Sequence, residues 1–153
     1  MNGNYKHGHS KFGEKGNDQK RNYGSRETIK QTFNETFKDE WIENGIDREA
    51  VNFTEKLGKF ISNNGMTPSQ IRNVFGEIKR IQIKGYEIEK ASFYLLKPKF
   101  AYAAKRNKSD GINEMKKIFD SAHAAVNNET SFSNFVDFYE SILAYHKAFS
   151  NKE

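Results

Sequence analysis

The chain has 153 residues, enough for one domain with its own core, although only 35% of them are hydrophobic. It contains no cysteine, which excludes a disulfide framework, a thiolate metal site and a cysteine nucleophile. The sequence shows neither an apolar run long enough to span a bilayer nor a signal-peptide core, so we expect a cytoplasmic protein that does not enter a membrane.

Residues 1–25 are predicted to form a disordered basic tail. Five of the eleven glycines lie there, together with Asn, Lys and Ser, and almost nothing in the segment can be buried. His7 and His9 lie in this tail without carboxylate or thiol partners, so we assign no metal to them. Residues 26–153 are expected to form one helical domain.

The first two predicted helices end at glycine-containing stops. One begins after Ser25 and ends near "ENG", and the next begins at Asp47 as its N-cap and ends near "NNG". The first has hydrophobic residues at Ile29, Phe33, Phe37 and Trp41, and the second turns Val51, Thr54, Leu57, Phe60 and Ile61 inward.

Residues 66–84 carry the strongest helix signal. Thr67 is a good N-cap, Pro68 suits the first helical position and Gln70 completes a capping box. The apolar stripe consists of Ile71, Val74, Phe75, Ile78 and Ile81. Gly85 is predicted to end or bend this helix.

Three more helical stretches follow. The first spans about residues 87–106, and Pro98 within it is expected to kink or restart the helix. The second has its core positions at Ile112, Met115, Phe119, Ala122 and Val126, and the last at Phe132, Phe135, Phe138 or Tyr139, Ile142, Tyr145 and Phe149. Because no alternating strands occur, the sequence predicts an all-α, compact bundle of five to six amphipathic helices.

Positive charge is concentrated in one block of the sequence. Residues 66–106 hold nine Lys and Arg against three acidic residues, whereas the segments on either side are mildly acidic. This asymmetry favours contact with a polyanion. The predicted cations are Arg72, Lys79 and Arg80 on a face apart from the apolar stripe, extended by Lys97, Lys99, Lys105 and Arg106 if the two helices lie side by side.

Signals for catalysis are weak. The sequence contains no H-E-x-x-H, G-x-S-x-G or P-loop motif. Glu35, Asp39 and Glu43 are spaced by four residues, which is more typical of a solvated helix face than of a metal site. His123 and His146 lie on separate helices without a nucleophile pattern, and His146 is expected to be a packing residue. We therefore expect no enzyme activity, no cofactor and no metal.

Three stretches, "TPSQIRNVFGEIKRIQ", "FYLLKPKFAYAAKR" and "FVDFYESILAYHKAF", resemble the small subunit of type III-A CRISPR effector complexes, the Csm complex. The resemblance covers most of residues 45–149. It implies a non-catalytic helical bundle in antiviral defence, several copies of which stack along a ribonucleoprotein filament. The implied partners are crRNA and target RNA, other copies of itself, the Csm backbone subunits and the large signalling subunit.

Two other functions are compatible with the residues. A regulator of double-stranded DNA would use the helix that begins at Pro68 to read bases through Arg72 and Asn73, but "SNNGMTP" is longer than the usual helix-turn-helix turn. A pure protein-interaction bundle would use exposed Phe and Tyr and would show no salt-sensitive binding to nucleic acid.

Overall fold

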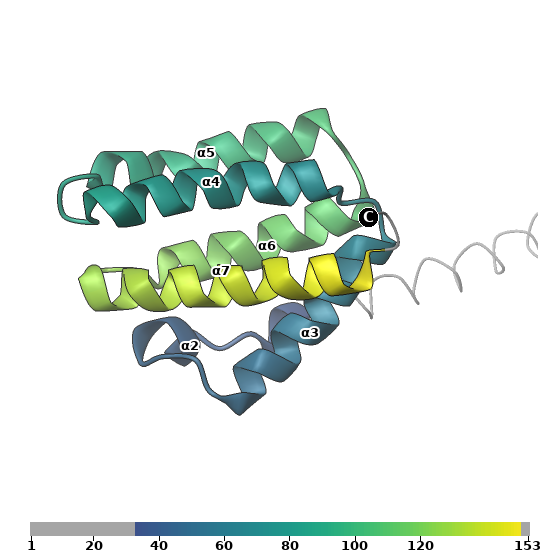
Figure 1. The fold of residues 1–153 in the computed structure, drawn as a ribbon, viewed down its shortest axis with the longest axis horizontal. Coiled ribbons are helices and arrows are strands. Elements are labelled where there is room, and N and C mark those ends of the chain that lie inside the picture. Colours follow the sequence, from purple (N-terminus) through teal and green to yellow (C-terminus); the bar gives the residue numbers. More distant parts are fainter. Residues whose placement is uncertain (1–32, 151–153) are drawn as a thin grey trace, which may run out of the picture. The chain divides into compact units, whose positions relative to one another are not determined.

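The computed structural model describes residues 33–150, and regular structure in that range is entirely α-helical, as predicted. Of the described residues, 36–150 form one compact unit. The predicted tail, and residues 26–32 at the start of the first predicted helix, lie outside the described residues. The labelled helices are α2 (Glu40–Glu43), α3 (Arg48–Asn63), α4 (Pro68–Lys84), α5 (Lys90–Arg106), α6 (Asp110–Ala124) and α7 (Glu129–Phe149) (Figure 1).

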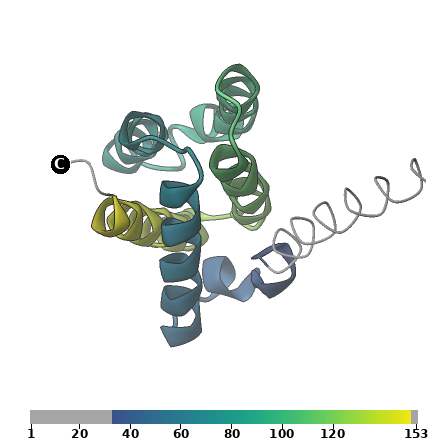
Figure 2. The same cartoon turned by 90° about the vertical axis from the view of Figure 1, so that its right-hand side faces the viewer.

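Four long helices lie roughly side by side in this unit. α4 and α5 form one layer and α6 and α7 form a second, whereas α3 crosses α7 (Figures 1 and 2). α7 contacts α2, α3 and α4, so it is the central helix of the bundle. Consecutive antiparallel helices with short connections are typical of such bundles.

Local sequence fixes most helix ends. Asp47 accepts a hydrogen bond from the Ala50 N–H at 2.8 Å, and Thr67 and Gln70 form the predicted capping box at the start of α4. Such caps each contribute about 1 kcal/mol. Gly85 ends α4 with a φ of 106°, a conformation that a residue with a side chain rarely adopts.

Aromatic side chains form two clusters in the core and account for most of its largest buried residues. One cluster joins Phe37, Trp41 and Phe53 to Phe138 of α7, with ring centroids 5.2–6.3 Å apart. A second cluster contains Tyr86, Phe93, Phe119, His123, Phe132 and Phe135. Because each aromatic side chain buries about 150–250 Å², a chain with few hydrophobic residues still forms a dense core.

Two glycines allow helices to approach closely. A Cβ at Gly58 of α3 would lie 2.6 Å from the Tyr145 Cβ and 2.9 Å from the His146 backbone nitrogen of α7. A Cβ at Gly111 would lie 2.8 Å from the Ile61 carbonyl oxygen, where the start of α6 meets the end of α3. Both approaches leave no room for a methyl group.

The first predicted helix is not continuous. Helical backbone ends at Thr36 and resumes at Glu40, so the expectation of one unbroken helix as far as "ENG" was wrong. Phe37, in the interruption, packs against both Trp41 and Phe138. Tertiary packing of this ring prevails over the local helical pattern.

α5 continues through Pro98 and does not restart there. Proline removes one helical N–H donor, which leaves the Tyr94 carbonyl oxygen without its usual partner. Pro98 and Tyr94 are both exposed, so water can bind that oxygen. The helix therefore tolerates the proline, because the carbonyl oxygen that loses its hydrogen bond lies on the solvent-exposed face.

Candidate nucleic-acid interface

α4 and α5 lie side by side, as the predicted basic surface requires (Figure 1). Ion pairs link them: Arg80 Nη1 lies 3.0 Å from Glu89 Oε1, and Lys99 Nζ lies 3.7 Å from Glu77 Oε2. Arg80 Nε also donates to Glu77 Oε1 at 2.6 Å. Two of the seven predicted RNA-binding cations are thus partly neutralised by carboxylates of this chain.

The pKa directions agree with these ion pairs. The hydrogen bond from Arg80 is the main reason why the pKa of Glu77 is lowered. The pKa of Glu89 is lowered chiefly by the Ser92 hydroxyl and then by Arg80. Both carboxylates are therefore ionised at neutral pH and compete with any phosphate for Arg80.

Arg72 and Lys79 occupy a different side of α4. Arg72 lines a cavity together with residues of α7, and Lys79 Nζ lies 5.8 Å from the centre of the Phe75 ring. At 3.6 residues per turn, Arg80 is rotated by about 80° from Arg72. The expectation of one shared face was thus only partly right, because Arg80 turns towards α5 and Arg72 towards α7.

The remaining predicted cations are on the solvent side of α5. Lys97, Lys105 and Arg106 are exposed, and within residues 33–150 none of them forms an ion pair. Lys105 and Arg106 lie in the last turn of α5, where cations also interact favourably with the helix dipole.

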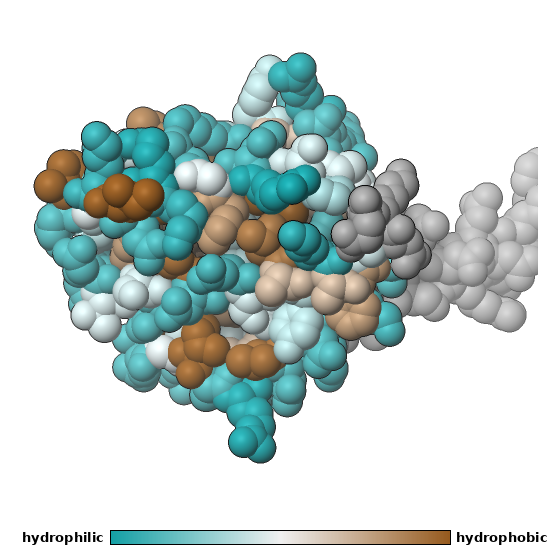
Figure 3. Space-filling view, in the orientation of Figure 1, coloured by the Kyte–Doolittle hydropathy of each residue, from teal (hydrophilic) through white to brown (hydrophobic). Residues whose placement is uncertain are grey.

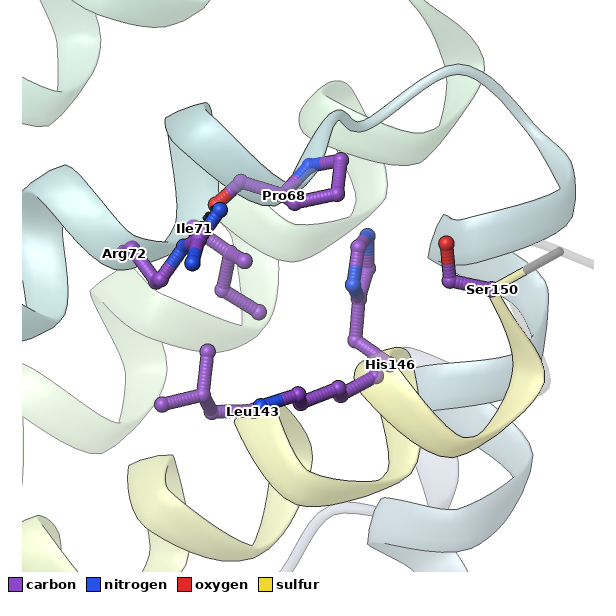
Figure 4. A pocket seen from close by; sticks show the side chains of 7 residues that line it. Pro68, Ile71, Arg72, Leu143, His146 and Ser150 are labelled. Atoms are coloured by element: carbon purple, nitrogen blue, oxygen red, sulfur yellow. Dashed lines mark hydrogen bonds between the residues drawn. The ribbon is translucent and has the colours of Figure 1, made fainter. Parts of the chain in front are cut away.

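The cavity beside Arg72 lies between the first turns of α4 and the last turns of α7. It has a volume of about 270 Å³ and is lined by Pro68, Ile71, Arg72, Leu143, His146, Lys147 and Ser150 (Figure 4). A neighbouring cavity of about 370 Å³ shares Pro68, His146 and Ser150 with it. Lys147 did not emerge as a candidate from the sequence, because only the packing of α7 on α4 brings it near Arg72.

The two predicted non-catalytic histidines both have packing roles. His146 is 2% exposed, and its Nε2 lies 2.6 Å from the Met66 carbonyl oxygen. His123 Nε2 lies 2.7 Å from the Phe93 carbonyl oxygen, and its ring stacks on that of Phe93 with centroids 4.1 Å apart. Burial lowers the pKa of His123.

The predicted carboxylate series does not form on one helix. Because the helix is interrupted at residues 37–39, Glu35, Asp39 and Glu43 do not share a continuous helix face. Among the described residues, no group of three or more His, Asp or Glu side chains is placed to hold a metal ion. Nor does any helix in that part of the chain have the length and hydrophobicity to cross a membrane.

Large hydrophobic side chains are exposed on α5 and at the connection between α4 and α5. They are Ile83, Ile88, Tyr94, Leu95 and Tyr102, with exposed fractions from 53% to 83%. Figure 3 shows hydrophobic surface at the end of α4 and α5 where the two helices connect, on the left of the view. Exposed apolar side chains gathered in this way are typical of a surface that contacts protein.

Comparison with models of known protein families gives a match. The sequence model of the family described as Csm2 Type III-A matches residues 47–152, well over half of the chain. The search of curated proteins and the search of solved structures found no match.

Proposed function

Because this chain belongs to the Csm2 Type III-A family and is a small subunit of the type III-A Csm complex, we propose that it binds the backbone of crRNA and target RNA within that complex. The observation that carries the proposal is that five of the seven predicted cations on α4 and α5 have no carboxylate partner among the described residues: Arg72, Lys79, Lys97, Lys105 and Arg106.

A surface of this kind suits contact with phosphates. In an RNA-guided complex base pairing reads the sequence, so the protein needs only to follow the backbone. Arg80 and Lys99 remain part of the proposed surface with a smaller contribution, because a phosphate must displace Glu77 or Glu89 from them.

The exposed hydrophobic side chains support the protein contacts of the proposal. We assign the outer face of α5, which carries Tyr94, Leu95 and Tyr102, to contact with another protein subunit of the Csm complex. Stacking of several copies along the filament, and contacts with the backbone and large signalling subunits, belong to the same proposal.

The proposed role in antiviral defence is non-catalytic and cytoplasmic. The packing roles of His123 and His146 support it, since both Nε2 atoms are occupied by backbone carbonyl oxygens. The subunit would need no cofactor, and the RNA-cutting carboxylates would lie on other subunits.

The test compares two triple variants in the assembled complex with target RNA. Lys97→Ala/Lys105→Ala/Arg106→Ala removes cations from α5, and Arg48→Ala/Lys56→Ala/Lys117→Ala removes the same charge from exposed positions on α3 and α6. Each lost contact with a single-strand phosphate flattens the log–log salt dependence of binding by about 0.7. We expect the α5 variant to lose up to about 2 units of slope and the control variant to lose little.

The loss of slope should be similar for unrelated RNA sequences, because these contacts position the RNA backbone and do not read its bases. Equal slopes for both variants and the wild type, with the complex intact, would contradict RNA binding by α5. A loss confined to particular sequences would favour a base-reading role.

A further inference from the structure

We propose that the cavity between α4 and α7 holds one phosphate group of the RNA backbone, with Arg72 and Lys147 as its two cationic contacts. This inference rests on the proposed RNA-binding function and adds Lys147, on a helix outside the predicted surface, to the site.

The size of the cavity suits a small anionic group. Its volume of about 270 Å³ lies just below the range of roughly 300–1,000 Å³ that is typical of pockets for whole small-molecule ligands. It opens between the ends of two helices, so a phosphate could enter while the rest of an RNA strand stays outside.

The charges around the cavity all have one sign. Arg72 and Lys147 line it, and neither of the two adjoining cavities has a carboxylate among its lining residues. Arg72 Nε lies 3.4 Å from the Pro68 carbonyl oxygen, a long contact that leaves both Nη groups available as donors. A guanidinium of this kind can bind two phosphate oxygens at once.

The wall of the cavity is held in place by packing. His146 lines both cavities, and its Nε2 must be the donor to Met66 because a carbonyl oxygen only accepts. Figure 4 shows the His146 ring standing between Pro68 of α4 and Ser150 at the end of α7. The ring therefore serves as a fixed wall, and it provides a local reporter of anything that enters.

A double-mutant cycle tests whether the two cations share one phosphate. Full-length Arg72→Ala, Lys147→Ala and the double variant are assembled into the complex, and RNA affinity is measured against salt concentration. One shared phosphate predicts that the double variant loses about 0.7 units of log–log slope in total, with affinity losses that are not additive.

If each cation bound a separate phosphate, the double variant would lose about 1.4 units of log–log slope and the two affinity losses would add. That result would overturn the shared site. Arg48→Ala/Lys117→Ala, which removes the same charge from α3 and α6, is the matched control. An unchanged slope in the double variant would overturn the proposal. If the α5 triple variant still lost slope in that case, the proposed function would stand without this site.

The second measurement uses inorganic phosphate and the isolated full-length chain. We expect phosphate, but not sodium chloride at equal ionic strength, to shift the NMR signals of the His146 ring and of Arg72 Nε–H in a saturable way. Arg72→Ala/Lys147→Ala should abolish the His146 shift. Saturable shifts combined with an unchanged RNA slope would overturn the assignment to RNA, and absence of shifts would overturn the anion site itself.

Discussion

The two sides of α4 place similar cations in opposite surroundings. On the side next to α5, Arg80 is held by Glu77 and Glu89. On the side next to α7, Arg72 lines a cavity that contains a second cation and no carboxylate. The available positive charge on a helix is therefore decided by its neighbours in space, and a count of lysines and arginines along the sequence does not give it.

The largest expected effect concerns the packing of α3 against α7, the helix that lines the cavity beside Arg72. Gly58→Ala should lower the free energy of unfolding by about 1–3 kcal/mol or more, because the new methyl group would overlap Tyr145 and the His146 backbone. Chemical denaturation measures the change. The same displacement should weaken RNA binding through the Arg72 side of α4 more than through the Arg80 side.

Gly76→Ala is the matched control for this substitution. Gly76 lies within α4, and a Cβ there would have nothing within 4 Å. The variant should be more stable than the wild type by up to about 1 kcal/mol, because alanine is the better helix former. Equal destabilisation by the two substitutions would show that α3 and α7 do not pack this closely.

A smaller change should make the two sides of α4 more alike. Glu77→Gln/Glu89→Gln removes the carboxylate charges that hold Arg80 and Lys99. RNA binding in the complex should become more salt-dependent, by about 0.7 units of slope for each new phosphate contact. Glu55→Gln/Glu140→Gln, at exposed positions on α3 and α7, controls for the change in net charge. An equal effect of both pairs would mean that the ion pairs do not restrain Arg80.

The smallest effect concerns pH and the attachment of α5 to α6. Burial, and to a lesser degree the charge of Lys97, lower the pKa of His123, whereas the Phe93 carbonyl and Asp120 act in the opposite direction. In the unfolded chain the histidine takes up a proton near pH 6.5, but in the folded chain it does so only at lower pH. The unfolded state thus binds more protons in this window, so the free energy of unfolding should fall as the pH drops below about 6.5.

His123→Gln keeps a donor for the Phe93 carbonyl but cannot be protonated. Denaturation of this variant at about pH 7 and pH 5.5 should show a smaller loss of stability than the wild type shows. Identical losses in the two proteins would assign the acid sensitivity to other groups.

Signals that act within one turn of helix were predictable from the sequence. The capping box of Thr67 and Gln70 is as expected, because both partners lie three residues apart. The close approach at Gly58 was not predictable, since the contacting residues of α7 lie far along the chain. Arg80 was assigned to RNA contact without its partner Glu89, because Glu89 reaches it only across the turn between α4 and α5.

Patterns that compete with tertiary packing were predicted less well. The spacing of Phe37 and Trp41 indicated a continuous helix, but the ring of Phe37 reaches α7 from an interruption. Arg72 was identified as a candidate from its helix face, whereas Lys147 was missed because its place in the site depends on the packing of α4 against α7.

The proline within α5 affects how another subunit can bind the outer face of that helix. Pro98 supplies no N–H to the Tyr94 carbonyl oxygen, which lies on a face where Tyr94, Leu95 and Tyr102 are exposed. A protein that covers this face removes water from that oxygen and must replace the water with a donor of its own. A partner surface that is entirely apolar would leave this oxygen without a hydrogen bond. The partner must therefore bind in the one orientation that places a hydrogen-bond donor opposite the Tyr94 carbonyl oxygen.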